Sequence, residues 1–311
     1  MRILFMGTPD FALPTLRELC LAGHEIVGAV TQPDKPKGRG HHLTPPPIKV
    51  FALEKNIPVY QPMTLRGEEF AALLSELDPE MIVVVAYGKI LPQNVLDYPK
   101  YGCVNVHGSL LPEYRGAAPM QRAIIDGKNV TGITTMLMAA GLDTGDMLLK
   151  CEVEICENDN FEDIHDRLSE AGAELLIETV NGLEKGEIVP EAQDDGKSTY
   201  AAKIEKSDCL LDFSLDARTL HNLIRGLSPI PLSFTHTPDG KLLKVVKSRV
   251  CDDEKTVKCL PGTVLSVGEE IQVACGKGIL SIITLVPEGK GRMSAGDFVR
   301  GRKIAEGDLL S

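Results

Sequence analysis

The chain has 311 residues and a formal net charge of -11, with 43% apolar and 25% charged residues. This composition is typical of a soluble globular protein, and the sequence has no run of eighteen apolar residues that would span a membrane. A chain of this length commonly folds as two domains, and we expect two here.

The opening MRILFMG predicts a first β-strand, because its apolar stretch is too short for a signal peptide and is interrupted by Gly7. After it, short β-branched runs alternate with amphipathic stretches, a pattern typical of a mostly parallel sheet with helices on both faces. The predicted strands are 2–6, 26–31, 81–86, 103–107, 132–138 and 148–155. The predicted helices are 14–22, 48–55, 67–77, 118–126 and 160–185. We therefore expect residues 1–189 to form an α/β domain with a Rossmann-like sheet.

The segment 190–207 is polar and irregular, which predicts a linker between two domains. Residues 208–311 begin with a predicted helix at 216–227 and continue with short apolar runs separated by turns. One of these turns, Asp239-Gly240, has the sequence of a hairpin. This spacing predicts a small antiparallel β-barrel as the second domain.

Charge is distributed unevenly between the two halves of the chain. Residues 1–205 hold 18 Lys and Arg against 31 Asp and Glu, whereas residues 206–311 hold 15 against 13. The balance is therefore -13 in the first part and +2 in the second. A weakly basic second half permits a polyanionic partner even though the whole chain is acidic.

The cysteines and histidines lack the spacing of metal sites. Eight cysteines form no CxxC pair, and the seven histidines show no HxH or HxxxH arrangement. We expect reduced thiols, a cytoplasmic location and no bound metal. The first strand also leads into GTPDFALP, which has neither GxGxxG nor the P-loop spacing, so nucleotide binding by those devices is disfavoured.

The densest motif is CVNVHGSLLPEYRGAAP at 103–119, where a predicted strand runs into a glycine- and proline-rich loop. Asn105 and His107 are two residues apart and point to the same side of that strand. They lie near its carboxyl end, where open α/β sheets place their ligands. An amide and an imidazole there are suited to stabilising an oxyanion and moving protons. Taken alone, the same two residues also fit a turn and a hydrogen-bonded core histidine.

Three further segments carry candidate residues. GLDTGD at 141–146 places two carboxylates between glycines, which fits a close approach to a ligand or an ordinary turn. The loop 31–47 is basic, rich in glycine and proline, and longer than most connections, so it is either functional or a solvated excursion. PEGKGRM at 287–293 places Lys290 and Arg292 in a glycine turn, which also fits a solvated hairpin tip.

The joint pattern of these segments resembles the 10-formyltetrahydrofolate-dependent formyltransferases, in particular those that act on methionyl-tRNA. The resemblance extends over most of the chain, in the order RILFMGTPDFALPTL, TQPDKPKGRG, VVVAYGKILP, NVHGSLLPEYRGAAP, TGITTM, GLDTGDM, TYAAKI, LIRGLSPIP and PEGKGRM. It implies an N-terminal sheet domain that holds the folate and a C-terminal barrel of oligonucleotide-binding type that helps to hold tRNA. The implied reaction transfers the formyl group of 10-formyltetrahydrofolate to the α-amine of initiator methionyl-tRNA for translation initiation, by an enzyme expected to be monomeric.

The resemblance also implies roles for individual residues. The catalytic trio corresponds to Asn105, His107 and Asp143. Folate contacts correspond to Ile90, Leu91, Pro92, Ser109, Leu110, Leu111, Pro112 and Leu142, many of them through the backbone. Contacts with tRNA correspond to Arg39, Lys35, Lys37, Lys290 and Arg292.

Two departures from the family pattern stand out. His41 and His42 occupy positions where lysines often follow the GRG of the basic loop, and the chain contains no Trp. Three alternative functions remain: formyl transfer to an amino sugar nucleotide, hydrolysis of formyltetrahydrofolate, and folate or RNA binding without catalysis. The basic loop and the GKGRM turn argue against the first two, and an intact trio argues against the third.

Overall fold

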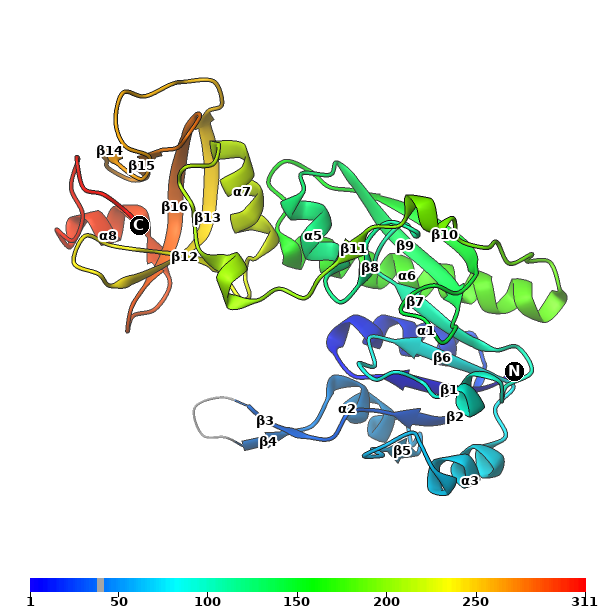
Figure 1. Cartoon of the computed structure of the whole chain (residues 1–311). Coiled ribbons are helices and arrows are strands. Elements are labelled where there is room, and N and C mark those ends of the chain that lie inside the picture. The colour runs from blue at the N-terminus through cyan, green and yellow to red at the C-terminus, as the bar shows by residue number, and fades with distance from the viewer. Residues whose placement is uncertain (38–41) are drawn as a thin grey trace. The chain divides into compact units, whose positions relative to one another are not determined.

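The computed structural model describes residues 1–37 and 42–311 (Figure 1). It contains two compact units, each assembled from separate parts of the chain. The first unit comprises Met1–Gly116, Thr131–Val153 and His165–Tyr200. The second comprises Ala117–Val130, Glu154–Ile164 and Ala201–Ser311.

The first unit is built on a seven-stranded sheet with the order β10-β9-β7-β6-β1-β2-β5. The strands are β1 (Arg2–Gly7), β2 (Glu25–Val30), β5 (Val59–Tyr60), β6 (Met81–Val85), β7 (Cys103–His107), β9 (Val130–Leu137) and β10 (Met147–Glu154). The pairs from β5 through to β7 are parallel, whereas β9 is antiparallel to β7. The predicted α/β class with a mostly parallel sheet is therefore confirmed.

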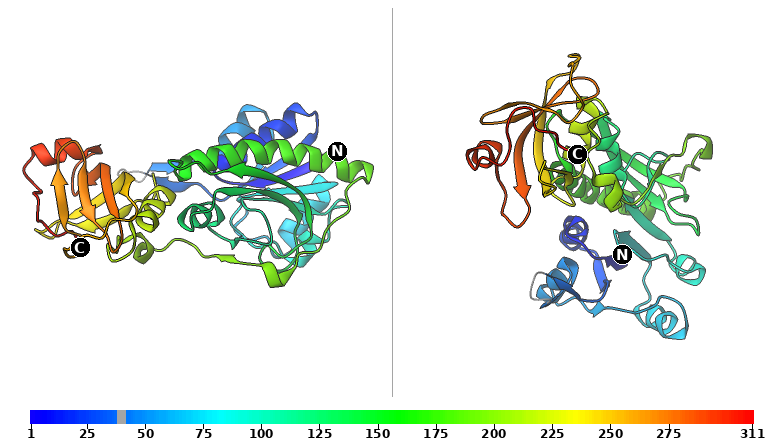
Figure 2. Two further views of the ribbon diagram at one scale, coloured as in Figure 1. Left: turned by 90° about the horizontal axis from the view of Figure 1, so that it is seen from above. Right: turned by 60° about the vertical axis from the view of Figure 1, so that its left-hand side comes forward.

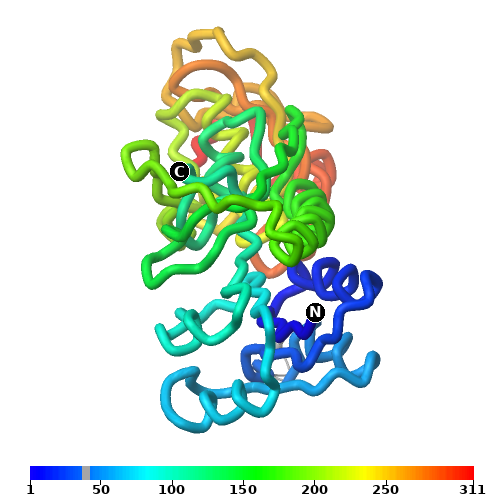
Figure 3. Tube along the Cα trace, turned by 90° about the vertical axis from the view of Figure 1, so that its right-hand side faces the viewer, coloured from blue at the N-terminus to red at the C-terminus, as the bar shows by residue number. Residues whose placement is uncertain are grey.

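Helices pack on both faces of this sheet because its central strands are apolar on both sides. On one face, Leu4 and Met6 of β1 share a core with Phe70 and Leu74 of α3. On the other face, α1 and α6 lie side by side (Figures 2 and 3), and Ser169 Oγ of α6 donates to the Phe11 carbonyl at 2.9 Å. The helices are α1 (Leu13–Leu21), α2 (Pro47–Glu54), α3 (Glu68–Leu77), α4 (Gln93–Leu96) and α6 (Phe161–Lys185).

The second unit contains an antiparallel sheet with the order β12-β13-β16-β15-β14, and β17 pairs with β16. Its elements are α7 (Ala217–Gly226), β12 (Ser233–His236), β13 (Leu242–Asp252), β14 (Val264–Val267), β15 (Ile271–Ala274), β16 (Ile279–Pro287), β17 (Met293–Ser294) and α8 (Ala295–Arg300). Apolar side chains of α7, α8 and the sheet, among them Leu220, Val245 and Phe298, form one core. The Asp239-Gly240 turn joins β12 to β13 as predicted, with Gly240 at a φ of 77°.

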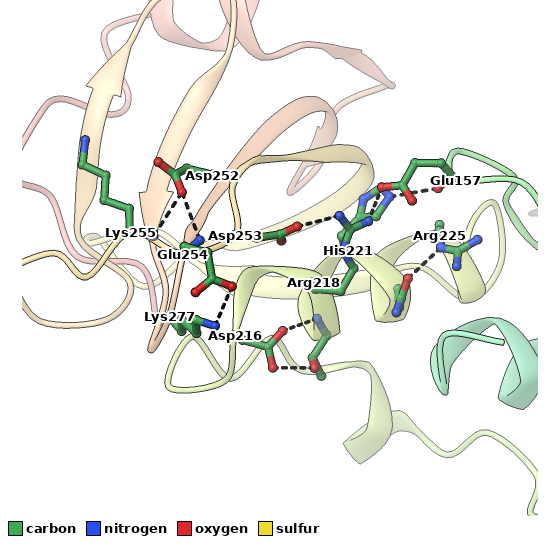
Figure 4. Close-up of polar contacts among 12 residues, drawn as sticks. Glu157, Asp216, Arg218, His221, Arg225, Asp252, Asp253, Glu254, Lys255 and Lys277 are labelled. Atoms are coloured by element: carbon green, nitrogen blue, oxygen red, sulfur yellow. Dashed lines mark hydrogen bonds and ion pairs between the residues drawn. The ribbon is translucent and has the colours of Figure 1, made fainter. Parts of the chain in front are cut away.

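Two segments that precede residue 190 belong to this second unit, whereas the predicted division placed them in the first domain. One carries α5 (Pro119–Ile125), which packs closely on α7: a Cβ on Gly226 would lie 2.7 Å from Ile125 Cγ1. The other, 154–164, is held by charged and polar side chains of α7 (Figure 4). Arg218 pairs with the Glu157 carboxylate, and Arg225 Nη1 donates to the Asp159 carbonyl at 3.1 Å.

The segment 190–207, predicted as an irregular linker, is more ordered than its polar composition suggested. It contains the 3-10 helix Asp195–Lys197 and the short strand β11 (Tyr200–Ala201), and a second 3-10 helix, Lys206–Cys209, begins within it. This strand pairs with β8 (Arg115–Gly116). The polar side chains of this segment are used in specific hydrogen bonds, which composition alone does not reveal.

Candidate active site

His107 is the last residue of β7, and its ring is almost fully buried with 6% of its surface exposed. Its Nε2 lies 3.0 Å from the carbonyl oxygen of Tyr114. Because a carbonyl only accepts hydrogen bonds, Nε2 carries a proton and donates it. The other ring nitrogen, Nδ1, lies 3.7 Å from Oδ2 of Asp143. The ring is thus placed between a carbonyl and a carboxylate.

Asn105 is half-buried and lies two residues earlier on the same strand. The intervening Val106 faces α6, since a Cβ on Gly172 of that helix would lie 2.9 Å from Val106 Cγ1. Successive side chains of a strand point to opposite faces, so Asn105 and His107 both point away from α6. The structure thus brings the amide and the imidazole to one side of the sheet.

Asp143 lies in the loop between β9 and β10, with a φ of 50° in the left-handed region. The Gly116 backbone N–H donates to its Oδ2 at 2.8 Å, so the same oxygen that faces His107 is fixed by a main-chain donor. Gly145 allows the loop to fold back closely, because a Cβ there would lie 1.7 Å from the Leu137 carbonyl oxygen. The carboxylate side chain is only 15% exposed.

The loop that follows His107 is supported by hydrogen bonds within the first unit. Tyr114, with a φ of 58°, donates its N–H to Thr199 Oγ1 at 2.8 Å. Ser109 is fully buried, and its hydroxyl donates to the Glu113 carbonyl at 2.6 Å. Thr134 of β9 donates to the Ser109 carbonyl and accepts from the Leu111 N–H. These contacts hold the Tyr114 carbonyl against the His107 ring.

The sequence did not single out Gln193, Thr199, or the partner roles of Tyr114 and Gly116. They hold the centre through hydrogen bonds between segments distant in the chain. For Gln193 the only available signal was the polar run EAQDDGKSTY, which composition interprets as a linker, whereas Thr199 begins the TYAAKI segment of the family resemblance.

The residues predicted to contact folate differ in exposure. The side chains of Ser109, Leu91 and Leu111 are buried, whereas Ile90 and Leu142 are 79% and 55% exposed. Leu110, Pro92 and Pro112 are half-buried. Within the segment that carries Ile90, Ala86 and Gly88 have positive φ angles of 48° and 83°.

The residues predicted to contact tRNA lie in both units. Lys35 is exposed on β3 (Lys35–Lys37), which pairs with β4 (His42–Thr44). The predicted contact Arg39 and the departure at His41 lie outside the described residues, as do the side chains of Lys37 and His42. Lys290 and Arg292 are exposed in the turn between β16 and β17.

Further basic residues of the second unit accompany Lys290. Its charge lowers the pKa of Lys303, with a smaller effect from Lys241, so these amines lie close together. Lys241, Arg302 and Lys303 also line a pocket of about 300 Å³ together with the carboxylates of Asp239 and Glu288. Its mixed charge does not define a ligand.

Within residues 1–37 and 42–311, no group of three or more His, Cys, Asp and Glu is arranged to hold a metal ion. Over the same residues, no helix combines the length and the apolar character needed to cross a membrane. All eight cysteines are free, and burial raises the pKa of Cys103 to about 12.

Both parts of the chain match known proteins, the part with the polar centre at the end of β7 and the part with the antiparallel sheet. Residues 1–180 match the family model described as formyl transferase, and residues 203–303 match that of the formyl transferase C-terminal domain. The chain belongs to the formyl transferase family.

Its curated relatives are more specific. The methionyl-tRNA formyltransferase of Citrifermentans bemidjiense is 51% identical over 311 residues, which cover 100% of this chain and 96% of that protein. The methionyl-tRNA formyltransferase of Bacillus subtilis (strain 168) is 50% identical over 311 residues, which cover 99% of this chain and 97% of that protein.

Solved structures share the fold at lower identity. HypX from Aquifex aeolicus in complex with tetrahydrofolic acid is 17% identical with a TM-score of 0.63, and the match covers 96% of this chain but 47% of HypX, about half its length. The N-formyltransferase from Helicobacter canadensis in complex with folinic acid and dTDP-3-aminofucose is 16% identical with a TM-score of 0.68, covering 90% of this chain and 98% of that one.

Proposed function

We propose that this chain transfers the formyl group of 10-formyltetrahydrofolate to the α-amine of methionine esterified to initiator tRNA. The observation that carries the proposal is the 51% identity to a methionyl-tRNA formyltransferase over all 311 residues. The product is N-formylmethionyl-tRNA, which serves translation initiation. The enzyme acts as a monomer in the cytoplasm.

The residues at the end of β7 fit the needs of this reaction. The folate carries the formyl group on N10, and the attacking α-amine, which titrates near ~7.7–8.0 before the ester lowers that value, needs no activated serine or cysteine. Asn105 donates its side-chain N–H to the formyl oxygen as negative charge develops there, a contact typically worth about 10²–10³ in rate. His107 lies on the same side of the strand, with its ring held between the Tyr114 carbonyl and the Asp143 carboxylate.

Asp143 and His107 act together on the proton. The carboxylate faces the ring Nδ1 at 3.7 Å and orients the ring. It also accepts the proton lost by the amine and passes it toward N10, a transfer usually worth about 10²–10⁴. The Gly116 N–H fixes the carboxylate for this role.

Exposed apolar side chains beside the two loops suit the folate ring system. Ile90 and Leu142 are 79% and 55% exposed, and an aromatic ligand that covers them would remove apolar surface from water. Ser109, Leu91 and Leu111 are at most 3% exposed, main chain included, so they shape the loops beside the folate. Thr134 holds the Ser109 carbonyl and the Leu111 N–H in this loop.

The basic segments suit the phosphates of tRNA. Lys35, Lys37 and Arg39 belong to the long loop after β2, and Lys290 and Arg292 to the turn before β17. Such contacts give affinity that falls as salt rises. Sugar nucleotides carry far fewer phosphates, so two separate basic segments favour a tRNA acceptor over an amino sugar nucleotide.

One acceptor comparison tests the proposal. Purified protein is incubated with 10-formyltetrahydrofolate carrying a labelled formyl group and with initiator methionyl-tRNA, elongator methionyl-tRNA or an amino sugar nucleotide, and formate release is measured without acceptor. We expect label on initiator methionyl-tRNA, recovered as formylmethionine. Label on the sugar alone would indicate a sugar formyltransferase, and label released only as formate would indicate a hydrolase. Folate binding with no transfer would indicate a binding protein without catalysis. Each of these results would contradict the proposal.

A further inference from the structure

The 191–200 segment, in the stretch expected to be a linker, contacts both loops of the candidate centre. At its start, Glu191 exchanges two backbone hydrogen bonds with Met147 of β10, at 2.8 and 2.9 Å. Near its end, the Thr199 carbonyl accepts from the Arg115 N–H at 2.9 Å, and Figure 1 shows β11 beside β8. Both ends of the segment are therefore anchored within the first unit.

Between these anchors, the Gln193 side chain bonds to the loop that carries Asp143. Its Nε2 donates to the backbone carbonyls of Asp143 and Gly145, at 2.8 and 2.7 Å. Its Oε1 accepts from Arg115 Nε at 2.9 Å, and Arg115 Nη2 in turn pairs with Asp195 at 2.8 Å. Both amide donors are used, and Arg115 fixes which end of the amide faces the loop.

These bonds close a ring around Asp143. Arg115 reaches the Asp143 backbone through Gln193, while the next residue, Gly116, holds the Asp143 carboxylate directly at 2.8 Å. Asp143 has a positive φ, which is unfavourable for a residue with a side chain and persists only where surrounding bonds hold it. The Gln193 amide supplies that hold at the Asp143 backbone carbonyl.

We propose that Gln193 is a positioning residue for formyl transfer: its amide fixes the Asp143 backbone so that the carboxylate faces His107. The inference rests on the proposed function, because it requires that Asp143 acts in the reaction. Gln193 itself touches no reacting atom and acts through Asp143. Arg115 acts one step further out by orienting the amide.

The sharpest test is Gln193→Glu, which keeps the size of the side chain and its acceptor for Arg115 but replaces two donors by an oxygen that repels the two carbonyls. A displacement of the order of 1 Å at a reacting group can lower the rate about 100-fold. We expect kcat to fall about 10- to 100-fold, with KM for folate and for methionyl-tRNA within about threefold of wild type. Gln272→Glu, the same change on β15 of the second unit, should leave both constants unchanged.

A double-mutant cycle with Asp143→Asn separates positioning from a general structural role. If Gln193 acts through Asp143, adding Gln193→Glu to Asp143→Asn lowers kcat less than about threefold further. Two results would overturn the inference and leave the proposed function standing. One is a double variant whose loss of kcat equals the product of the two single losses. The other is a Gln193→Glu variant with wild-type kcat beside an Asp143→Asn variant with a lowered kcat. An Asp143→Asn variant with wild-type turnover would overturn the proposed role of Asp143 and the inference with it.

Thermal unfolding of each variant checks that the fold is retained. Should Gln193→Glu fail to fold, Gln193→Ala decides, because it removes the two donors without adding a charge. It should show the same loss of kcat with little change in KM. A normal kcat in Gln193→Ala would overturn the inference.

Discussion

The two neighbours of His107 fix the orientation of its ring. Nε2 donates to the Tyr114 carbonyl, and Nδ1 lies 3.7 Å from the Asp143 carboxylate. Because these two contacts occupy both ring nitrogens, the ring cannot turn without losing one of them.

His221 of α7 makes the stability of the fold depend on pH. Its ring is 3% exposed, with Nε2 donating to the Glu157 carbonyl at 3.3 Å and Nδ1 3.1 Å from Ser248 Oγ. Burial is the main cause that lowers the pKa of His221 below its ordinary 6.5, and the charges of Arg225 and Arg218 lower it further against the opposing effect of Glu157.

A folded-state pKa below the unfolded value means that the unfolded chain binds the proton more readily. The buried, neutral ring of His221 therefore contributes fully to the free energy of unfolding above pH 6.5. This contribution is lost as the pH falls from 6.5 through the lower folded-state pKa. We expect the free energy of unfolding to fall more between pH 7.5 and 5.5 in the wild type than in His221→Gln. Urea unfolding of both proteins at several pH values measures this free energy, and equal pH dependences in the two proteins would contradict the expectation.

At the residue scale, strand parity was enough to predict that Asn105 and His107 share a side, because the alternation of side chains is a local property. The roles of Gln193 and Thr199 could not be predicted in this way. Each bonds to a loop some 50 to 85 positions away in the sequence. Nothing in the neighbouring residues reports such a partner.

At the scale of elements, the strand of the dense motif and the long amphipathic helix were predicted nearly to the residue. The strand expected at 103–107 is β7 (Cys103–His107), and the helix expected at 160–185 is α6 (Phe161–Lys185). The pairs β3–β4 and β8–β11 and the short helix α8 were not predicted. The paired strands have two or three residues each and depend on partners elsewhere in the chain, and the six residues of α8 are too few to show helical periodicity.

The base of the basic loop is held by a compact hydrogen-bonded cluster. Lys49 Nζ of α2 lies 2.9 Å from both carboxylate oxygens of Asp34 and 2.9 Å from Gln61 Oε1. Gln61 Nε2 donates to Asp34 and to the Gln32 carbonyl. Hydrogen bonds from Gln61 and Lys49 lower the pKa of Asp34, which keeps it ionised. Asp34 directly precedes β3, so the cluster fixes the point where the loop begins.

Lys49→Met removes the charge that joins this cluster. Loosening the loop base adds an ordering penalty of about 1 kcal/mol to tRNA binding, which corresponds to a roughly fivefold higher KM for methionyl-tRNA. We expect kcat and the KM for folate to stay within about twofold of wild type. Lys100→Met removes an equal charge from the first unit and serves as the control. Steady-state kinetics measure these constants. Equal KM values for methionyl-tRNA in Lys49→Met and Lys100→Met would contradict the proposal that the Lys49 cluster holds the loop for tRNA binding.

At the scale of the whole molecule, the two compact units do not follow the linear order of the sequence. The segments 117–130 and 154–164 belong to the second unit because α5 packs on α7 and because Arg218 and Arg225 bind the 154–164 backbone and side chains. A domain boundary predicted from composition cannot detect that segments before it pack in the second unit. The charge division, -13 up to residue 205 and +2 beyond it, is visible in the sequence and agrees with a polyanionic acceptor.

The central claim is that the whole chain transfers formyl groups to methionyl-tRNA at His107. The most direct measurement is the transfer of labelled formyl from 10-formyltetrahydrofolate to initiator methionyl-tRNA, with both substrates saturating, for the wild type, His107→Ala and His165→Ala. His165 also faces a carboxylate, 2.8 Å away on Asp166, and controls for loss of a histidine–carboxylate pair in the first unit. We predict a rate at least about 100-fold lower for His107→Ala, with the variant still folded but its thermal unfolding midpoint lowered by the loss of the buried ring, and a normal rate for His165→Ala. A correctly folded His107→Ala that transfers formyl at the wild-type rate would contradict the account.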